Sequence, residues 1–108
     1  MSKHFFESPL DAAPAPRLID VGWDRPCGHF YLNVEDQGLQ EESAQVYISM
    51  YDPRTFEPGR HPRLIGGLSL DEVRARFEEL CITPPDGLIE ALADDQRRNA
   101  GNEARGWS

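Results

Sequence analysis

The chain has 108 residues, of which 39% are hydrophobic and 28% are charged, and these values are typical of a single soluble globular domain. Its 19 acidic and 11 basic residues give a net charge of −8, which argues against direct binding to nucleic acid, because phosphates require a basic surface. No apolar run approaches the roughly 20 residues that span a membrane, so we expect no membrane association. No secretory signal is visible, and the abundance of Ala, Gly, Pro and Arg is typical of a bacterial genome rich in GC. We therefore expect a cytoplasmic protein with reduced thiols.

The N-terminal segment and the three strands that follow it are distinguished by their hydrophobic pattern. Residues 1–16 contain three closely spaced prolines, which remove backbone donors and predict a flexible N-terminal arm. After the arm the pattern alternates with period two, as in half-buried strands. It predicts strands over about 18–23, 29–35 and 45–51, of which the first has the weakest pattern. The sequence therefore predicts a small antiparallel sheet of two or three strands.

A long connection follows the strands. Residues 52–68 contain three prolines and three glycines and show no sustained hydrophobic period. Connections in compact domains have a median length of about 4–6 residues, and longer ones often carry function. We expect this loop to be one part of any binding surface.

Two helices are predicted after the loop. Ser69 followed by Glu72 is the pattern of a capping box, and it predicts a helix over about 70–81. Thr83 followed by proline is typical of a second N-terminus, and it predicts a helix over about 84–100. The remaining residues are expected to form a frayed tail.

The order of these elements predicts the fold class. Strands that precede a pair of helices favour an α+β domain, in which both helices pack on one face of the sheet. We expect residues 17–108 to form this one domain.

Cys27 and His29 are the first candidates for chemistry. Residues two positions apart on a strand share a face, so the thiol and the imidazole could approach each other as a nucleophile and its base. No catalytic cysteine signature surrounds them. We interpret Cys27 as a turn residue and His29 as the start of a strand, and we expect no catalytic residue here.

A metal site is the second interpretation of the same residues. The available soft ligands are Cys27, His29, His61 and Cys81, with His4 in reserve. A structural zinc site usually shows two close ligand pairs, and this sequence has one. The sequence therefore predicts no metal site and no cofactor.

The predicted binding surface is the sheet face opposite the helices. If the apolar positions of the two stronger strands face the helices, their polar positions place three tyrosines and a histidine on the other face. Tyrosine is enriched at protein interfaces because it combines apolar area with a polar tip. Basic residues of the long loop could adjoin this face. The predicted binding residues are His29, Tyr31, Tyr47, Tyr51, Arg60, His61 and Arg63.

These features predict a small acidic binding or regulatory module that acts through a protein partner and has no catalytic activity of its own. A homodimer is also possible on this view. One alternative is an enzyme that uses the Cys27 and His29 pair. The other is an acidic mimic of nucleic acid that occupies the basic groove of a nucleic-acid-binding protein. The acidic turn with Glu35, Asp36, Glu41 and Glu42 is interpreted separately as solvated hairpin charge, with attraction of a basic partner as its functional alternative.

Overall fold

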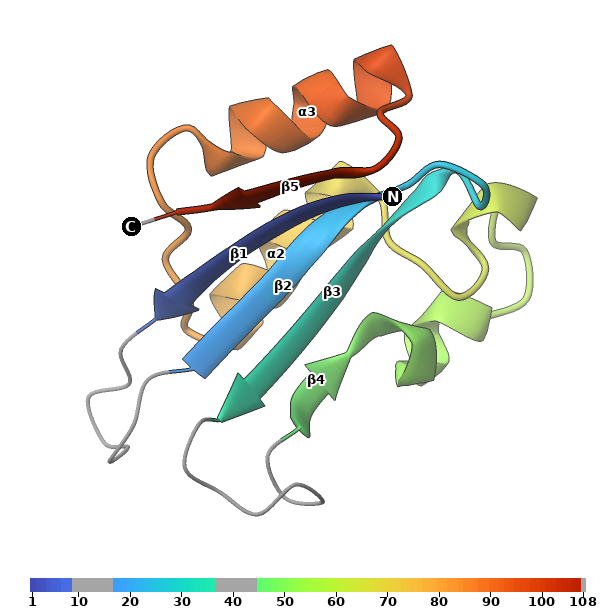
Figure 1. The fold of residues 1–108 in the computed structure, drawn as a ribbon. Coiled ribbons are helices and arrows are strands. Elements are labelled where there is room, and N and C mark those ends of the chain that lie inside the picture. Colours follow the sequence, from blue (N-terminus) through green and yellow to red (C-terminus); the bar gives the residue numbers. More distant parts are fainter. Residues whose placement is uncertain (9–16, 37–44, 108) are drawn as a thin grey trace.

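A five-stranded mixed sheet carries two α-helices on one face (Figure 1). The structure is a computed structural model, and it describes residues 1–8, 17–36 and 45–107. The strand order across the sheet is β4-β3-β2-β1-β5. The elements are β1 (Ser2–Ser8), β2 (Arg17–Asp24), β3 (His29–Asp36), β4 (Gln45–Ile48), α2 (Leu70–Glu79), α3 (Leu88–Arg98) and β5 (Glu103–Gly106). The predicted α+β class is confirmed, and the sheet is larger than predicted.

The sheet is antiparallel except at one edge. β1 to β4 pair as antiparallel neighbours, and β5 pairs with β1 in the parallel direction. The segment predicted over 18–23 is β2, which lies in the middle of the sheet between β1 and β3. None of the helices in the described part of the chain is long and apolar enough to cross a membrane.

β1 corrects the prediction of an arm over residues 1–16. Ser2, His4 and Phe6 are buried and alternate with exposed neighbours, as expected for a strand with one buried face. The Ser2 hydroxyl accepts a hydrogen bond from the Trp23 backbone N–H at 2.9 Å. Residues 9–16 of the predicted arm lie outside the described residues.

The C-terminal residues are also ordered in the sheet, so the prediction of a frayed tail is wrong. β5 pairs with β1, and the Trp107 backbone N–H donates to the Phe5 carbonyl at 2.9 Å. The Trp107 indole N–H donates to His4 Nδ1 at 3.0 Å. Since that nitrogen accepts, the other ring nitrogen donates to buried Asp95 at 2.6 Å. This chain of hydrogen bonds joins both termini to α3.

The helices differ in how closely they follow the prediction. The predicted capping box at Ser69 and Glu72 is present, and α2 begins directly after it. α3 begins at Leu88 instead of 84, and Gly87 at φ 90° is its N-cap. Each residue that precedes a proline is disfavoured in the helical region, so the two consecutive prolines after Thr83 delay the helix.

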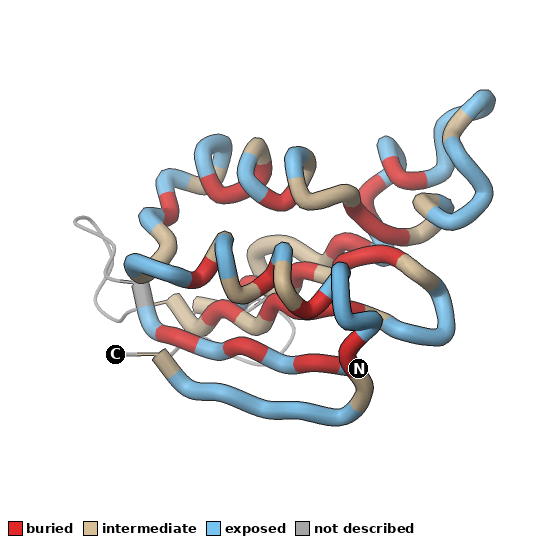
Figure 2. Tube along the Cα trace, turned by 90° about the horizontal axis from the view of Figure 1, so that it is seen from above, coloured by how far each residue is buried: buried red, intermediate tan, exposed pale blue. Residues whose placement is uncertain are grey.

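The core lies between the sheet and the two helices, where Figure 2 shows the buried segments of both layers facing each other. Its side chains come from alternate positions of the central strands and from one face of each helix. The fully buried members include Ile19, Val21, Phe30, Leu32, Val34, Leu68, Val73, Leu88 and Leu92. Burial of such a side chain contributes about 1.5–3 kcal/mol.

Candidate functional site

The predicted tyrosine face is divided between two sides of the sheet. A register shift between Val34 and Glu35 places Tyr47 opposite Val34. Directly opposite residues of an antiparallel pair share a face, so Tyr47 lies on the helix side together with Val34. Its hydroxyl donates to Asp52 at 2.8 Å. The predicted face for Tyr47 is therefore wrong, because a bulge reverses the alternation of β4.

Tyr31 lies on the open face as predicted, but its hydroxyl is used within the protein. It donates to the Asp20 carboxylate at 2.9 Å and to the Ser2 carbonyl at 3.1 Å. Burial and the neighbouring carboxylate of Asp20 raise the pKa of the phenol. Gly22 makes room for this contact, since a methyl group there would lie 2.0 Å from the Ser2 oxygen.

Asp52 organises the first half of the long loop. Its carboxylate accepts hydrogen bonds from the Tyr47 hydroxyl and from the backbone and guanidinium of Arg54, and Arg76 lies 3.7 Å away. Burial alone would raise the pKa of this carboxyl, but the hydrogen bonds from Arg54 and Tyr47 lower it to about 2. Asp52 therefore fixes the path of the chain as it leaves β4, whose pairing ends at Ile48 and not at residue 51 as predicted.

Arg60 organises the second half of the loop. Its guanidinium donates to Glu72 at 2.7 Å and to the Gly67 carbonyl at 2.7 Å, and its Nε donates to the Leu64 carbonyl at 3.0 Å. The hydrogen bond from Arg60 lowers the pKa of Glu72. Arg60 thus fastens the loop to α2, and its predicted role in binding a partner stays a prediction.

Large apolar side chains are exposed within the loop that these two residues hold and directly before it. In the described parts of the chain six large hydrophobic residues are exposed, and four of them lie between positions 50 and 65. The exposed fractions are 60% for Met50, 74% for Tyr51, 55% for Phe56 and 50% for Ile65. We call these four residues the apolar loop surface. Of the four, the sequence predicted only Tyr51 as a binding residue.

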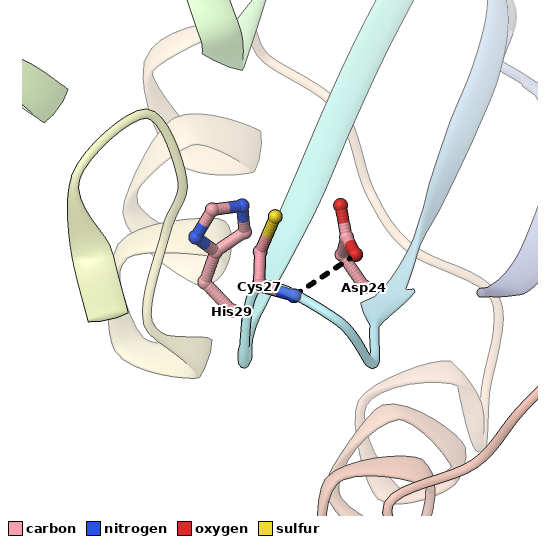
Figure 3. A group of neighbouring side chains, drawn as sticks. All are labelled: Asp24, Cys27 and His29. Atoms are coloured by element: carbon pink, nitrogen blue, oxygen red, sulfur yellow. Dashed lines mark hydrogen bonds between the residues drawn. The ribbon is translucent and has the colours of Figure 1, made fainter.

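A second feature lies at the turn between β2 and β3. Asp24 and His29 are directly opposite each other at the end of the ladder, and Cys27 lies in the turn that joins them. The turn is closed by the Gly28 N–H, which donates to the Asp24 carbonyl at 2.7 Å. Figure 3 shows the Cys27 sulfur between the imidazole of His29 and the carboxylate of Asp24. The potential ligand atoms of the three side chains lie within 4.8 Å of one another.

Cys27 and His29 border a cavity of about 730 Å³. Its wall includes Cys27 and His29 together with Arg25, His61 and Arg63. Among the described residues neither Arg25 nor Arg63 forms an ion pair.

Of the acidic turn considered in the sequence, Asp36 forms an ion pair with Arg17 at 2.9 Å. Glu41 and Glu42 lie outside the described residues.

The chemistry of Cys27 and His29 is set by their neighbours. The Cys27 thiol is exposed, but partial desolvation raises its pKa and the carboxylate of Asp24 raises the pKa further. This direction is opposite to what a thiolate nucleophile needs. His29 is 8% exposed, and its Nδ1 donates to the Arg63 carbonyl at 2.7 Å.

The other candidate ligands considered from the sequence are His61, Cys81 and His4. His61 lines the same cavity, and its Nδ1 accepts a hydrogen bond from the Arg63 backbone N–H at 3.1 Å. Cys81 is a free, exposed thiol after α2, and His4 is bonded to Asp95. Sequence reasoning missed Asp24, for which the signal was its place three residues before the cysteine.

No family model matches the chain, and neither a curated protein nor a solved structure matches it. Assignment of a function therefore depends on the geometry of the described residues.

Proposed function

We propose that the protein is a small acidic binding or regulatory module that engages a protein partner through the apolar loop surface, and that it has no catalytic activity of its own. The observation that carries the proposal is the exposure of four large apolar side chains between positions 50 and 65. Single exposed apolar residues are ordinary on protein surfaces, whereas a contiguous patch marks an interaction site. We infer such a patch from the closeness of the four residues in sequence and from the Phe56 ring, which lies beside Gly66, the neighbour of Ile65. Aromatic residues and methionine are also the types enriched at interfaces.

The loop that carries these side chains is held in place before binding. The hydrogen bonds of Asp52 fix the segment near Tyr51, and those of Arg60 fix the segment near Ile65. The Phe56 ring lies beside Gly66, where a methyl group would be 3.6 Å from the ring, so the two halves of the loop are in contact. A loop that is already ordered loses little conformational entropy when a partner binds.

The chemistry of the surface indicates the kind of partner. Its four side chains carry no charge, and two of the three arginines of the loop, Arg54 and Arg60, are paired with carboxylates. The expected partner is a folded protein with apolar pockets that accept the rings of Tyr51 and Phe56. We therefore expect an affinity that changes little with salt.

The proposal is tested by affinity capture from the native lysate with three forms of the full chain. The forms are the wild type, the double variant Tyr51→Ser with Phe56→Ser, and Phe5→Ser as the control. Phe5 is a matched control because it is an exposed aromatic residue outside the loop. The captured partner is then purified and its affinity is measured at low and high salt.

We expect the double variant to lose the partner by at least about 30-fold in affinity, as for interface residues that contribute about 2 kcal/mol or more. The Phe5 variant should bind as the wild type does. Equal binding by all three forms would contradict the proposal. A partner that is a second copy of this chain would appear as a dimer that the double variant abolishes.

The alternatives have less support from the structure. An enzyme that uses Cys27 as a nucleophile would need a lowered thiol pKa, whereas partial desolvation and the neighbouring Asp24 raise the pKa of this thiol. A mimic of nucleic acid would need free carboxylates. Carboxylates described here are instead paired with arginines, among them Asp36, Asp52 and Glu72. Binding that weakens steeply with salt would favour the mimic over the apolar surface.

A further inference from the structure

We propose that Asp24, Cys27 and His29 form a binding site for a divalent transition metal ion, and that Zn²⁺ is the ion their chemistry fits best. The site is separate from the apolar loop surface, and the proposal does not depend on the proposed function. The sequence alone predicted no metal site, so the proposal differs from that prediction.

The backbone brings the three ligands together. Asp24 and His29 end two paired strands, so the ladder fixes the distance between their Cα atoms. Two hydrogen bonds to Asp24 close the turn that carries Cys27. The Gly28 backbone N–H donates to the Asp24 carbonyl at 2.7 Å, and the Cys27 backbone N–H donates to Asp24 Oδ1 at 3.3 Å. Gly28 has φ 71°, which favours glycine in this turn. The cluster is thus part of the hairpin geometry.

The hydrogen bonds of the cluster leave one suitable atom free on each ligand. A carbonyl oxygen can only accept, so Nδ1 of His29 carries the proton that is donated to Arg63 at 2.7 Å. The lone pair of the neutral ring is therefore on Nε2. A histidine whose far nitrogen donates to a backbone carbonyl is the usual arrangement of a metal ligand. Oδ2 of Asp24 and the exposed Cys27 sulfur complete the set.

The position of the His29 ring is fixed by close packing. A methyl group at Gly67 would lie 2.1 Å from the ring carbon Cγ, so a side chain at this position would displace the ring. The loop carbonyl of Arg63 and the bare backbone of Gly67 together hold the imidazole in one orientation. A ligand held in this way loses little entropy when the metal binds.

The ligand set and its size fit zinc. One thiolate, one imidazole and one carboxylate are borderline-soft ligands that suit Zn²⁺ and do not suit Mg²⁺ or Ca²⁺. Tetrahedral zinc places its ligand atoms about 3–4 Å apart. The atoms here lie within 4.8 Å of one another, so small side-chain movements would be needed to reach that spacing. Binding releases the Cys27 proton to solvent and replaces waters of the hydrated ion.

Two of the three ligands, Cys27 and His29, line the cavity of about 730 Å³, so we expect the fourth coordination position to open into it. Three protein ligands with one position open to water or a small ligand is the pattern of zinc sites that exchange a ligand. Arg25 and Arg63 border this cavity, so the exchangeable ligand that their charge favours is an anion.

The test uses Co²⁺ as a spectroscopic probe on the metal-free, full-length protein. Bound Co²⁺ gives a thiolate-to-cobalt charge-transfer band that is absent from the hydrated ion, and Zn²⁺ should displace it. The band should form with the wild type and with Cys81→Ser, which removes the other free thiol. It should be lost in Cys27→Ser. His29→Asn keeps a donor for the Arg63 carbonyl but removes Nε2. It should weaken Co²⁺ binding by more than about 100-fold, which exceeds the usual loss when only a hydrogen-bonding partner of a ligand is removed.

A second measurement does not depend on variants. Zn²⁺ should protect Cys27 of the wild type from alkylation and leave Cys81 reactive, as read by mass spectrometry of the peptides. The proposal is overturned if no charge-transfer band forms with the wild type, or if the band persists in Cys27→Ser. It is equally overturned if Zn²⁺ protects neither thiol or both to the same degree.

Discussion

Replacement of Asp52 by asparagine tests whether hydrogen bonds to one carboxylate hold the long loop in place. The pKa of Asp52 lies at about 2 in the folded protein against an ordinary value of 3.8. This difference corresponds to about 2 kcal/mol of stabilisation when the carboxyl is charged. We therefore expect Asp52→Asn to lower the free energy of unfolding by about 2 kcal/mol at neutral pH.

The stabilisation by Asp52 should be lost at low pH. The folded pKa of Asp52 is depressed, so its stabilisation is fully present above the unfolded pKa and is lost as pH falls through the folded value. The difference in stability between wild type and Asp52→Asn should be constant near neutral pH. It should shrink as the pH falls below about 4 towards about 2.

The assay is urea unfolding of both proteins at several pH values, followed by tryptophan fluorescence. Glu79→Gln is the matched control, because Glu79 is an exposed carboxylate that pairs with the same Arg54. Exposed ion pairs contribute little, so this control should change stability much less than Asp52→Asn. Equal stability of wild type and Asp52→Asn at neutral pH would refute the reasoning. A difference that persists unchanged at low pH would refute it too.

Three further substitutions test other parts of the account. Gly67→Ala should displace the His29 ring and destabilise the protein by about 1–3 kcal/mol, and an unchanged imidazole signal in NMR would contradict this. Trp107→Phe keeps a ring but removes the N–H that donates to His4, and it should cost about 1 kcal/mol; an unchanged melting temperature would show that the bond does not stabilise the fold. Phe77→Ala should cost about 3–5 kcal/mol in urea unfolding, because this ring is buried between the layers, and a loss below 1 kcal/mol would be inconsistent with that position.

The elements that could be predicted from the sequence are those whose signals are local. The capping box at Ser69 and Glu72 lies within four residues of chain, and α2 begins where that pattern predicts. β3 carries three large apolar residues at alternate positions, so its buried face is visible without knowledge of its neighbours. In both cases the residues that form the element also carry the information that specifies it.

The terminal strands could not be predicted because their stabilising contacts are distant in sequence. β1 buries only one large apolar side chain, Phe6, and its other buried residues are polar groups satisfied by remote partners. His4 is bonded to Asp95 and Trp107, which lie about a whole chain length away. β5 has no buried residue, and it is a strand because its backbone pairs with β1.

The candidate sites were visible in part. The spacing of Cys27 and His29 drew attention to the turn, but Asp24 becomes a neighbour of His29 only through the pairing of β2 with β3. The face of Tyr47 was mispredicted because a bulge is not visible in the alternation of residues. Phe56 and Ile65 have no periodic pattern around them, so nothing in the sequence distinguished exposed from buried positions in the loop.

The central claim is that a protein partner contacts the apolar loop surface. The most direct measurement is site-specific photo-crosslinking in the native lysate, with the photoreactive residue placed at Phe56 in one form and at Phe5 in the other. We expect one protein to crosslink at the Phe56 position. The same protein should not crosslink at the Phe5 position, and unlabelled wild type should compete with its crosslinking. Crosslinks from the Phe5 position alone, or the same weak set of proteins from both positions, would contradict it.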